Sequence, residues 1–318
     1  MPRYARNALI LAKVETTAGV DAVPTGAANA LLVANLTINP LKANNVSRDL
    51  IRPFFGGSEQ LVGTATVEVS FDVELAASGT AGTAPAWGPL LLGCAFAEAV
   101  TAGSRVDYTP VTTGLKTLTI YYYDDGVLHK LLGAMGDVEI KAGIGERPLL
   151  GFKFEGIDGG VSAATATGTY TPWKKPLVVT DPNTGDILLG CTYSAGALSG
   201  GTSYPSRGFN AKMGNSVVYT PLLGGDSIDI TNRDVTGSIQ LDLTPAQEVA
   251  MFASVKANTT QGVGFTHGTT AGSQVMVFAP NVQLINPSKQ DVSGRRLIGF
   301  DLRMTPAAGN DDVRIVCL

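Results

Sequence analysis

Alternation of apolar and polar side chains is the strongest pattern in this chain of 318 residues. The clearest stretch is Thr66–Leu75, and a shorter one covers Gly237–Leu243. In the first stretch the apolar set is Val67, Val69, Phe71, Val73 and Leu75, and the polar set is Glu68, Ser70, Asp72 and Glu74. A side-chain period of two is that of a strand with one buried face and one wet face. We therefore predict two half-buried strands that lie far apart in the sequence.

The chain also repeats itself at low identity. Leu149–Gly156 reads LLGFKFEG and Leu297–Met304 reads LIGFDLRM, so both alternate and both contain a Gly-Phe pair. Upstream of these strands, Gly136–Ile140 matches Pro280–Leu284 as a turn followed by an alternating strand. The same elements in the same order predict an internal duplication.

Each half contains a single helical pattern, which follows its alternating strand. Pro89 begins the first helix, whereas Thr244 caps the second, with Pro245 in its first turn. Each half is thus predicted to contain two strands, a helix and three strands. The segment 158–207 is rich in Gly, Ser, Thr and Pro and is interpreted as a connector with short strands at 177–179 and 187–189. The prediction is a mainly β protein with two tandem domains, 1–170 and 171–318.

Composition and motifs argue against chemistry in this chain. Charged residues make up only 16%, the net charge is −4, and no basic cluster exists to hold nucleic acid tightly. Three widely spaced cysteines and two histidines offer neither a disulfide framework nor a metal knuckle, so the cysteines are interpreted as buried apolar residues. Neither GxxxxGK[ST] nor GxSxG occurs. We predict no enzyme, cofactor or metal, and no membrane partner, because no apolar run is long enough to cross a bilayer.

Two long connections need another explanation. Thr16–Ala30 has no periodicity, and Asn44–Gly63 separates two strands by far more than an ordinary hairpin loop. One interpretation is a mobile surface loop. The other is an arm that contacts a neighbouring subunit, with aromatic anchors and charged partners. The candidate contact residues are Arg48, Arg52, Phe54, Phe55, Thr17, Val20 and Val23.

Several segments in order carry a resemblance to a known family. They are Lys13–Gly19 (KVETTAG), Pro24-Thr25, the strand Leu31–Pro40, the arm Arg48–Gly63, the strand ending at Leu75, and Ala84–Cys94 (APAWGPLLLGC). The chain resembles the tail tube proteins of long-tailed phages and prophages. For the fold, the resemblance implies two tandem tail-tube β-sandwich or barrel domains, each with one flanking helix. For the location, it implies the virion tail of a siphophage-type phage, assembled in the host cytoplasm.

The resemblance also implies partners. Family subunits commonly have one domain and form six-fold rings, so three two-domain chains are expected to form a pseudo-hexameric ring that stacks into a tube. The lumen would hold tape measure protein and then double-stranded DNA without specific binding, and the tube would meet tail terminator and tail tip proteins. Glu68, Asp72 and Glu74 are candidate lumen-facing acids that would repel phosphate. Two alternatives stay open: the tube of a contractile tail or tail-like particle, and a carbohydrate-binding or adhesive β-sandwich.

Overall fold

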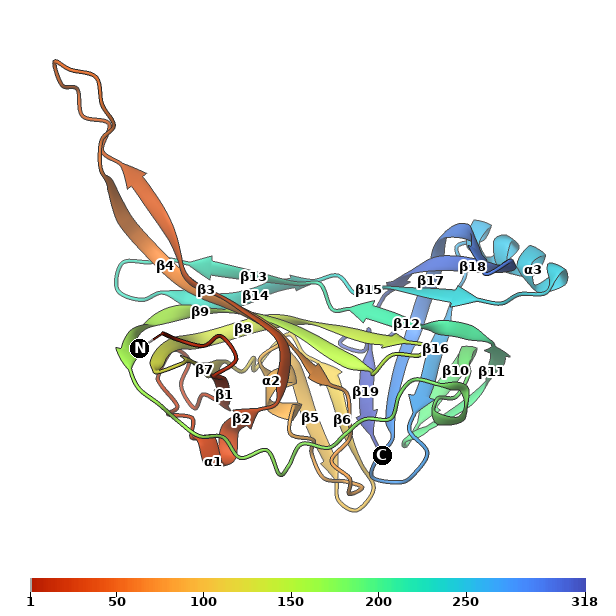
Figure 1. Cartoon of the computed structure of the whole chain (residues 1–318). Coiled ribbons are helices and arrows are strands. Elements are labelled where there is room, and N and C mark those ends of the chain that lie inside the picture. Colours follow the sequence, from red (N-terminus) through yellow and green to blue (C-terminus); the bar gives the residue numbers. More distant parts are fainter. Residues whose placement is uncertain (1) are drawn as a thin grey trace.

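The computed structural model describes residues 2–318 (Figure 1). The strands of the first half are β1 (Ala8–Val14), β2 (Ala30–Leu31), β3 (Val33–Ser47), β4 (Gln60–Glu74), β5 (Phe96–Thr101), β6 (Arg105–Pro110), β7 (Leu118–Asp124), β8 (Val127–Gly143) and β9 (Leu149–Ala163). Those of the second half are β10 (Ile187–Ser194), β11 (Ala197–Tyr204), β12 (Ser206–Lys212), β13 (Asn215–Thr220), β14 (Ser227–Arg233), β15 (Thr236–Leu241), β16 (Thr260–His267), β17 (Val275–Val292), β18 (Arg295–Met304) and β19 (Arg314–Cys317). The helices are α1 (Gly26–Asn29), α2 (Gly88–Leu92) and α3 (Pro245–Lys256), with a 3₁₀ turn, η1, at Asp181–Asn183. The mainly β prediction is confirmed.

The long strands of both halves form one continuous sheet. Its order is β3-β4-β9-β8-β12-β15-β18-β17, antiparallel throughout, and β8 joins the two halves by pairing with β12. In β4, Val67, Val69, Phe71 and Val73 are buried on one face, as the alternation predicts. The opposite face carries the polar side chains. We call the polar side of this eight-stranded sheet the polar face.

Shorter strands pack over the apolar side of this sheet. In the first half, β2, β1 and β7 pair in that order and continue onto the first part of β8. In the second half the order is β11-β10-β16-β17-β19-β6-β5. The β5–β6 hairpin of the first half thus completes the outer layer of the second. The result is a layered β-sandwich whose buried side chains form one continuous main core across both halves.

The duplication is visible in the register of the sheet. Val73 of β4 pairs with Leu150 of β9, and Leu241 of β15 pairs with Ile298 of β18. From these pairs the two ladders run in step for the whole length of β15. The register also corrects one sequence match. Ile140 pairs with Leu150, and Lys289 pairs with Ile298, the equivalent of Leu150. Gly136–Ile140 is therefore equivalent to Leu284–Lys289, which contains one extra residue at a bulge, and not to Pro280–Leu284.

A bulge recurs at the same place in both halves. Between β3 and β4 the register shifts after Ala34, and between β12 and β15 it shifts after Ser206. Asn35 and Gly208 occupy the two bulges, and both have positive φ, 51° and 121°. Asn and Gly are the residues that adopt this backbone most readily. β3 and β12 are therefore equivalent strands.

The repeated Gly-Phe pair has a packing reason. Gly151 of β9 and Gly299 of β18 lie on the polar face, where a long side chain from the next strand crosses each of them. A Cβ on Gly151 would come within 2.9 Å of the Lys141 Nζ, and a Cβ on Gly299 within 2.6 Å of the Gln290 amide nitrogen. The phenylalanine that follows points into the core.

The two predicted helices are present and differ in length. α2 is a short buried turn, whereas α3 has the full capping box, in which the Thr244 and Gln247 side chains each bond to the other's backbone N–H. In the connector, the strand at 187–189 is confirmed as part of β10. The strand expected at 177–179 is absent; Val179 instead exchanges backbone hydrogen bonds with the 143–146 turn. The division into domains 1–170 and 171–318 stays a prediction.

Candidate assembly surface

The eight-stranded sheet ends in two open edges. Among residues 2–318, β3 pairs only with β4, and the Ile285–Val292 part of β17 pairs only with β18. Each edge presents a row of backbone N–H and C=O groups with no ladder partner. Such edges are templates for pairing with another chain unless they are covered. The molecule therefore carries two edges available for sheet extension, one at each end of the eight-stranded sheet.

The β12–β8 pair inside the chain shows how two such edges fit. Phe209 lies opposite Ala142 and Asn210 lies opposite Lys141, in an antiparallel ladder of five residue pairs. The Phe209 ring packs against Phe265 with ring centroids 5.2 Å apart. The joint thus combines main-chain pairing with apolar burial on the core side.

The predicted lumen acids all lie on the polar face, and each is paired with a base. Glu68 contacts the Lys42 Nζ at 2.6 Å, Asp72 contacts the Lys141 Nζ at 3.1 Å, and Glu74 contacts Arg147 at 3.0 Å. Asp72 also accepts a bond from the Asn35 amide at 2.7 Å. The polar face is therefore a charge-balanced network and not a bare acidic wall.

Lys42 is the centre of one part of this network. It donates to Glu68 at 2.6 Å and to Glu155 at 3.1 Å, and the Thr66 hydroxyl donates to the same Glu155. The bond to Glu68 raises the pKa of Lys42. Burial alone would raise the pKa of Glu68, but Lys42 and Lys153 outweigh it and lower that pKa. Both partners stay charged near neutral pH, which ties the start of the β3–β4 hairpin to β9.

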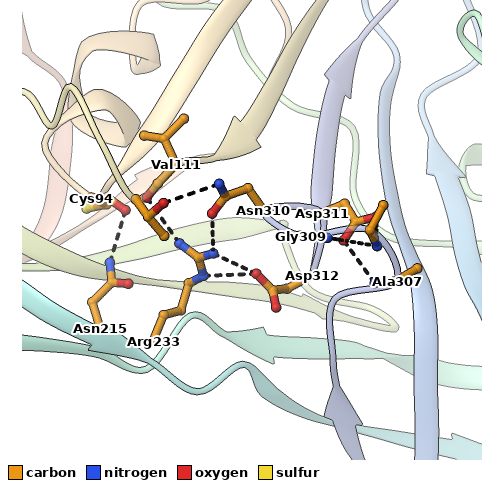
Figure 2. Close-up of polar contacts among 11 residues, drawn as sticks. Cys94, Val111, Asn215, Arg233, Ala307, Gly309, Asn310, Asp311 and Asp312 are labelled. Carbon is orange, nitrogen blue, oxygen red and sulfur yellow. Dashed lines mark hydrogen bonds and ion pairs between the residues drawn. The ribbon is translucent and has the colours of Figure 1, made fainter.

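A second hairpin, β13–β14, lies along β8 and β9 of the first half (Figure 1). Asn215 at its start is buried and donates to the backbone oxygens of Cys94 and Gly136, both at 3.0 Å (Figure 2 draws the bond to Cys94). Its backbone N–H donates to the Asp137 carboxylate. Burial raises the pKa of Asp137, and this N–H partly offsets the effect. The Asn215 side chain thus connects the loop after α2 to the β13–β14 hairpin.

The other strand of this hairpin ends in a buried ion pair (Figure 2). The Nε and one terminal nitrogen of Arg233 donate to the same oxygen of Asp312, at 3.0 and 2.7 Å, and Arg233 also donates to the Val111 carbonyl and to Asn310. The next carboxylate, Asp311, accepts from the backbone N–H groups of residues 307–309 and shapes that loop. The pair connects β14, the segment after β6 and the chain before β19.

Four of the predicted contact residues lie at the far end of the β3–β4 hairpin. The β3–β4 hairpin leaves the body as a long projection (Figure 1), and Arg48 pairs with Glu59 across it. Phe54 and Phe55 are 65% and 108% exposed at the tip, and Arg52 beside them is exposed as well. Within the described residues, both aromatic side chains are therefore uncovered.

The other three candidates lie elsewhere. Thr17, Val20 and Val23 are exposed on the loop between β1 and α1, on the body and not on the arm. That loop is held from inside by Glu15, a buried carboxylate that accepts bonds from Thr117, Thr119 and two backbone N–H groups. The structure does not bring the loop and the arm together.

Several residues of this surface were missed from the sequence. Asn215, Arg233 and Asp312 carry no local signal, because their partners lie 77 to 122 positions away. Lys42 lies in a strand of mixed polarity, where a lysine is commonly solvated. Gly214, directly before Asn215, was the available hint of a bend.

Three further features concern the cysteines, the possible metal ligands and the helix lengths of the described residues. Cys94, Cys191 and Cys317 are free and buried, as predicted. Within residues 2–318 no cluster of three His, Cys, Asp or Glu side chains is arranged to hold a metal ion. Over the same residues, every helix is too short or too polar to span a membrane.

A layered β-sandwich with two open sheet edges and a projecting arm defines a protein built for assembly. A family model described as phage tail tube protein matches residues 5–314, and this chain belongs to that family. The family is one of structural tail proteins and not of enzymes, and its place is the virion tail. A search of the curated proteins finds no match.

Proposed function

We propose that three copies of this chain close into a ring, and that stacked rings form the tube of a siphophage-type tail through which double-stranded DNA passes. The observation that supports this most is the continuous sheet with two open edges. Each chain contains two equivalent four-stranded units, joined once internally through β12 and β8. Pairing β3 of one copy with β17 of the next repeats that joint, and three such joints leave no edge open.

The internal joint specifies the register of the external one. Asn210 pairs with Lys141 inside the chain. By the equivalence of the ladders, Asn210 corresponds to Thr37 and Lys141 to Gln290. Thr37 is therefore expected to lie opposite Gln290 of the adjacent copy, with both side chains on the polar face.

The polar face is proposed to line the lumen, where tape measure protein and later DNA would lie without specific binding. Its paired charges support this role, because a surface whose cations are already neutralised has little to offer phosphate groups. Tail terminator and tail tip proteins would meet the two ends of the tube, and assembly would take place in the host cytoplasm.

The register is tested by a disulfide. Thr37→Cys with Gln290→Cys should give covalent trimers on a non-reducing gel, since directly opposed strand residues have their Cβ atoms about 5 Å apart. The native cysteines are buried and leave the background low. Thr37→Cys with Asp291→Cys is the matched control, because residue 291 points to the opposite face. A ladder without a closed trimer, or equal cross-linking by the control, would refute the ring.

A further inference from the structure

The segments that lead into β1 and β10, residues 3–7 and 179–183, fold in the same way. Each makes one tight turn in which an asparagine N–H donates to the carbonyl three residues before it. The two bonds are Asn7 to Tyr4 at 2.9 Å and Asn183 to Thr180 at 3.0 Å. The two segments therefore share a local conformation.

Each segment is also fastened to the end of an equivalent strand, β7 or β16. The backbone N–H directly past that strand donates to the asparagine carbonyl, from Asp125 at 3.0 Å and from Gly268 at 2.8 Å. The next residue of the segment then pairs with the strand end. These pairs are Ala8 with Asp124 and Thr184 with His267. The two segments are thus equivalent in place as well as in conformation.

In the second half, this segment forms a contact across the internal joint. Counted back from the asparagine, Val179 is the equivalent of Arg3. The Val179 carbonyl accepts a bond from the Gly145 N–H at 2.8 Å, in the turn between β8 and β9. Its side chain and that of Ala142 are 4% and 3% exposed and line one cavity between the halves. The internal contact is therefore apolar and buried.

The β17–β18 turn is the equivalent turn at the far end of the sheet. Since Lys141 corresponds to Gln290, Ala142 corresponds to Asp291. Asp291 is exposed, and its carboxylate accepts the Gly294 N–H at 2.9 Å. That N–H is therefore already bonded within its own turn. A segment that docks here meets a carboxylate where the internal joint has a methyl group.

Arg3 has the charge that this carboxylate needs. Both of its bonds to Asp124 come from one terminal nitrogen, so within residues 2–318 its Nε and other terminal nitrogen stay free to donate. The Arg3 side chain is 50% exposed. The bond to Asp124 fixes Arg3 at the strand end, as His267 fixes the Leu177 carbonyl in the second half. The donor is therefore positioned before any partner arrives.

We infer that residues 3–7 of one copy dock on the β17–β18 turn of the adjacent copy, with Arg3 paired to Asp291. This inference rests on the proposed ring. A second copy is the occupant that the molecule itself indicates, because the equivalent segment already lies on the equivalent turn inside the chain. An apolar contact within the chain is replaced by an ion pair between copies.

The bases beside Asp291 are compatible with this pair. Arg295 is held by Asp242 of its own copy. Arg296 lies opposite Asp291 in the hairpin, so the carboxylate would lie between bases from two copies. Exposed ion pairs are screened by salt, so the contact should contribute most at low ionic strength.

A charge swap tests the contact. Arg3→Asp or Asp291→Arg alone places like charges together at all three joints of the ring. Sedimentation velocity of the full-length proteins at low salt should show that each single variant needs about tenfold more protein for half-assembly into rings. The double variant should return to within about threefold of the unchanged protein, because the opposite charges meet again. Disruption of the segment itself would not be reversed in this way.

Arg6→Asp is the matched control. It makes the same charge change on the same exposed segment, but its equivalent, Pro182, does not line the cavity at the internal joint. Ring assembly of this variant should be unchanged. A double variant as weak as the single ones, or an equal loss with Arg6→Asp, would overturn the docking. If the unchanged protein forms no rings, the proposed function fails instead.

Discussion

Arg233 and Asp312 form a buried, doubly bonded ion pair, in which Nε and one terminal nitrogen of the guanidinium donate to a single carboxylate oxygen at 3.0 and 2.7 Å. Their side chains are only 11% and 10% exposed. Arg233→Ala would leave Asp312 buried without its cation, and loss of one partner of such a pair typically costs about 3–5 kcal/mol. We expect the urea midpoint of the full chain to fall accordingly.

The partner variant distinguishes charge from packing. Arg233→Met with Asp312→Leu removes both charges and keeps apolar volume, so most of the lost stability should return. If the double variant were as unstable as Arg233→Ala, the loss would come from the Val111 and Asn310 contacts of Arg233 and not from the stranded carboxylate.

Gly214 should tolerate no side chain. Gly214→Ala forces a Cβ against the Asp234 carbonyl at a positive φ, a combination expected to cost about 1–3 kcal/mol and to lift β13–β14 from the body. Gly225→Ala at the tip of the same hairpin meets no atom within 4 Å and serves as the control. Hydrogen exchange of the β13 amides would show the release directly; unchanged protection would exclude the proposed bend.

Lys42 should control the mobility of the arm more than the stability of the protein. Its side chain is half exposed, so its ion pairs contribute at most about 1 kcal/mol. Lys42→Met is expected to speed tryptic cleavage after Arg48 by up to about fivefold with little change in thermal midpoint. Lys289→Met, whose ion pair with Glu248 lies outside this network, should leave the cleavage rate unchanged.

His267 should make the second half sensitive to acid. It is buried, bonded to the Thr184 hydroxyl and the Leu177 carbonyl, and burial lowers its pKa from 6.5. Because the folded state then binds the proton less readily than the unfolded state, stability is full above about pH 6.5 and decreases as the pH falls toward the lowered pKa. His267→Gln should reduce the change in thermal midpoint between pH 7 and pH 5. An unchanged pH dependence would assign the acid sensitivity to the carboxylates.

The charge balance of the polar face can be tested in assembled tubes. Glu68→Gln, Asp72→Asn and Glu74→Gln together would remove one carboxylate partner from each of Lys42, Lys141 and Arg147, so that Lys42 keeps only Glu155 and Lys141 only Glu139. Tubes of this variant should retain double-stranded DNA at low salt and release it as salt rises, while unchanged tubes should retain little. Equal retention by both would place this face away from the lumen. The control is a variant with three carboxylate-to-amide substitutions on the outer surface, which changes the net charge by the same amount.

The elements differ in how far they could be predicted. The alternation of Val67 to Leu75 required a half-buried strand, and Thr244 with Pro245 required a helix start, since both patterns depend on near neighbours. The match of Leu149 with Leu297 agrees with the register, whereas Gly136–Ile140 is equivalent to Leu284–Lys289 and not to Pro280–Leu284, because pairing with the next strand and not the local pattern sets this register. The arm was predicted with its aromatic tip, but its tether at Lys42 was not.

Local periodicity and residue chemistry therefore determined that this chain is a mainly β protein with repeated strand patterns and a long connection between two strands, because strands, turns and caps depend on residues close in sequence. The tertiary structure alone decided that the two units share one sheet through β8 and β12, that the acids of its polar face are neutralised, and that one hairpin bends while its equivalent stays straight. Those features depend on pairings between residues many tens of positions apart, where strand register and a single glycine determine which side chains meet.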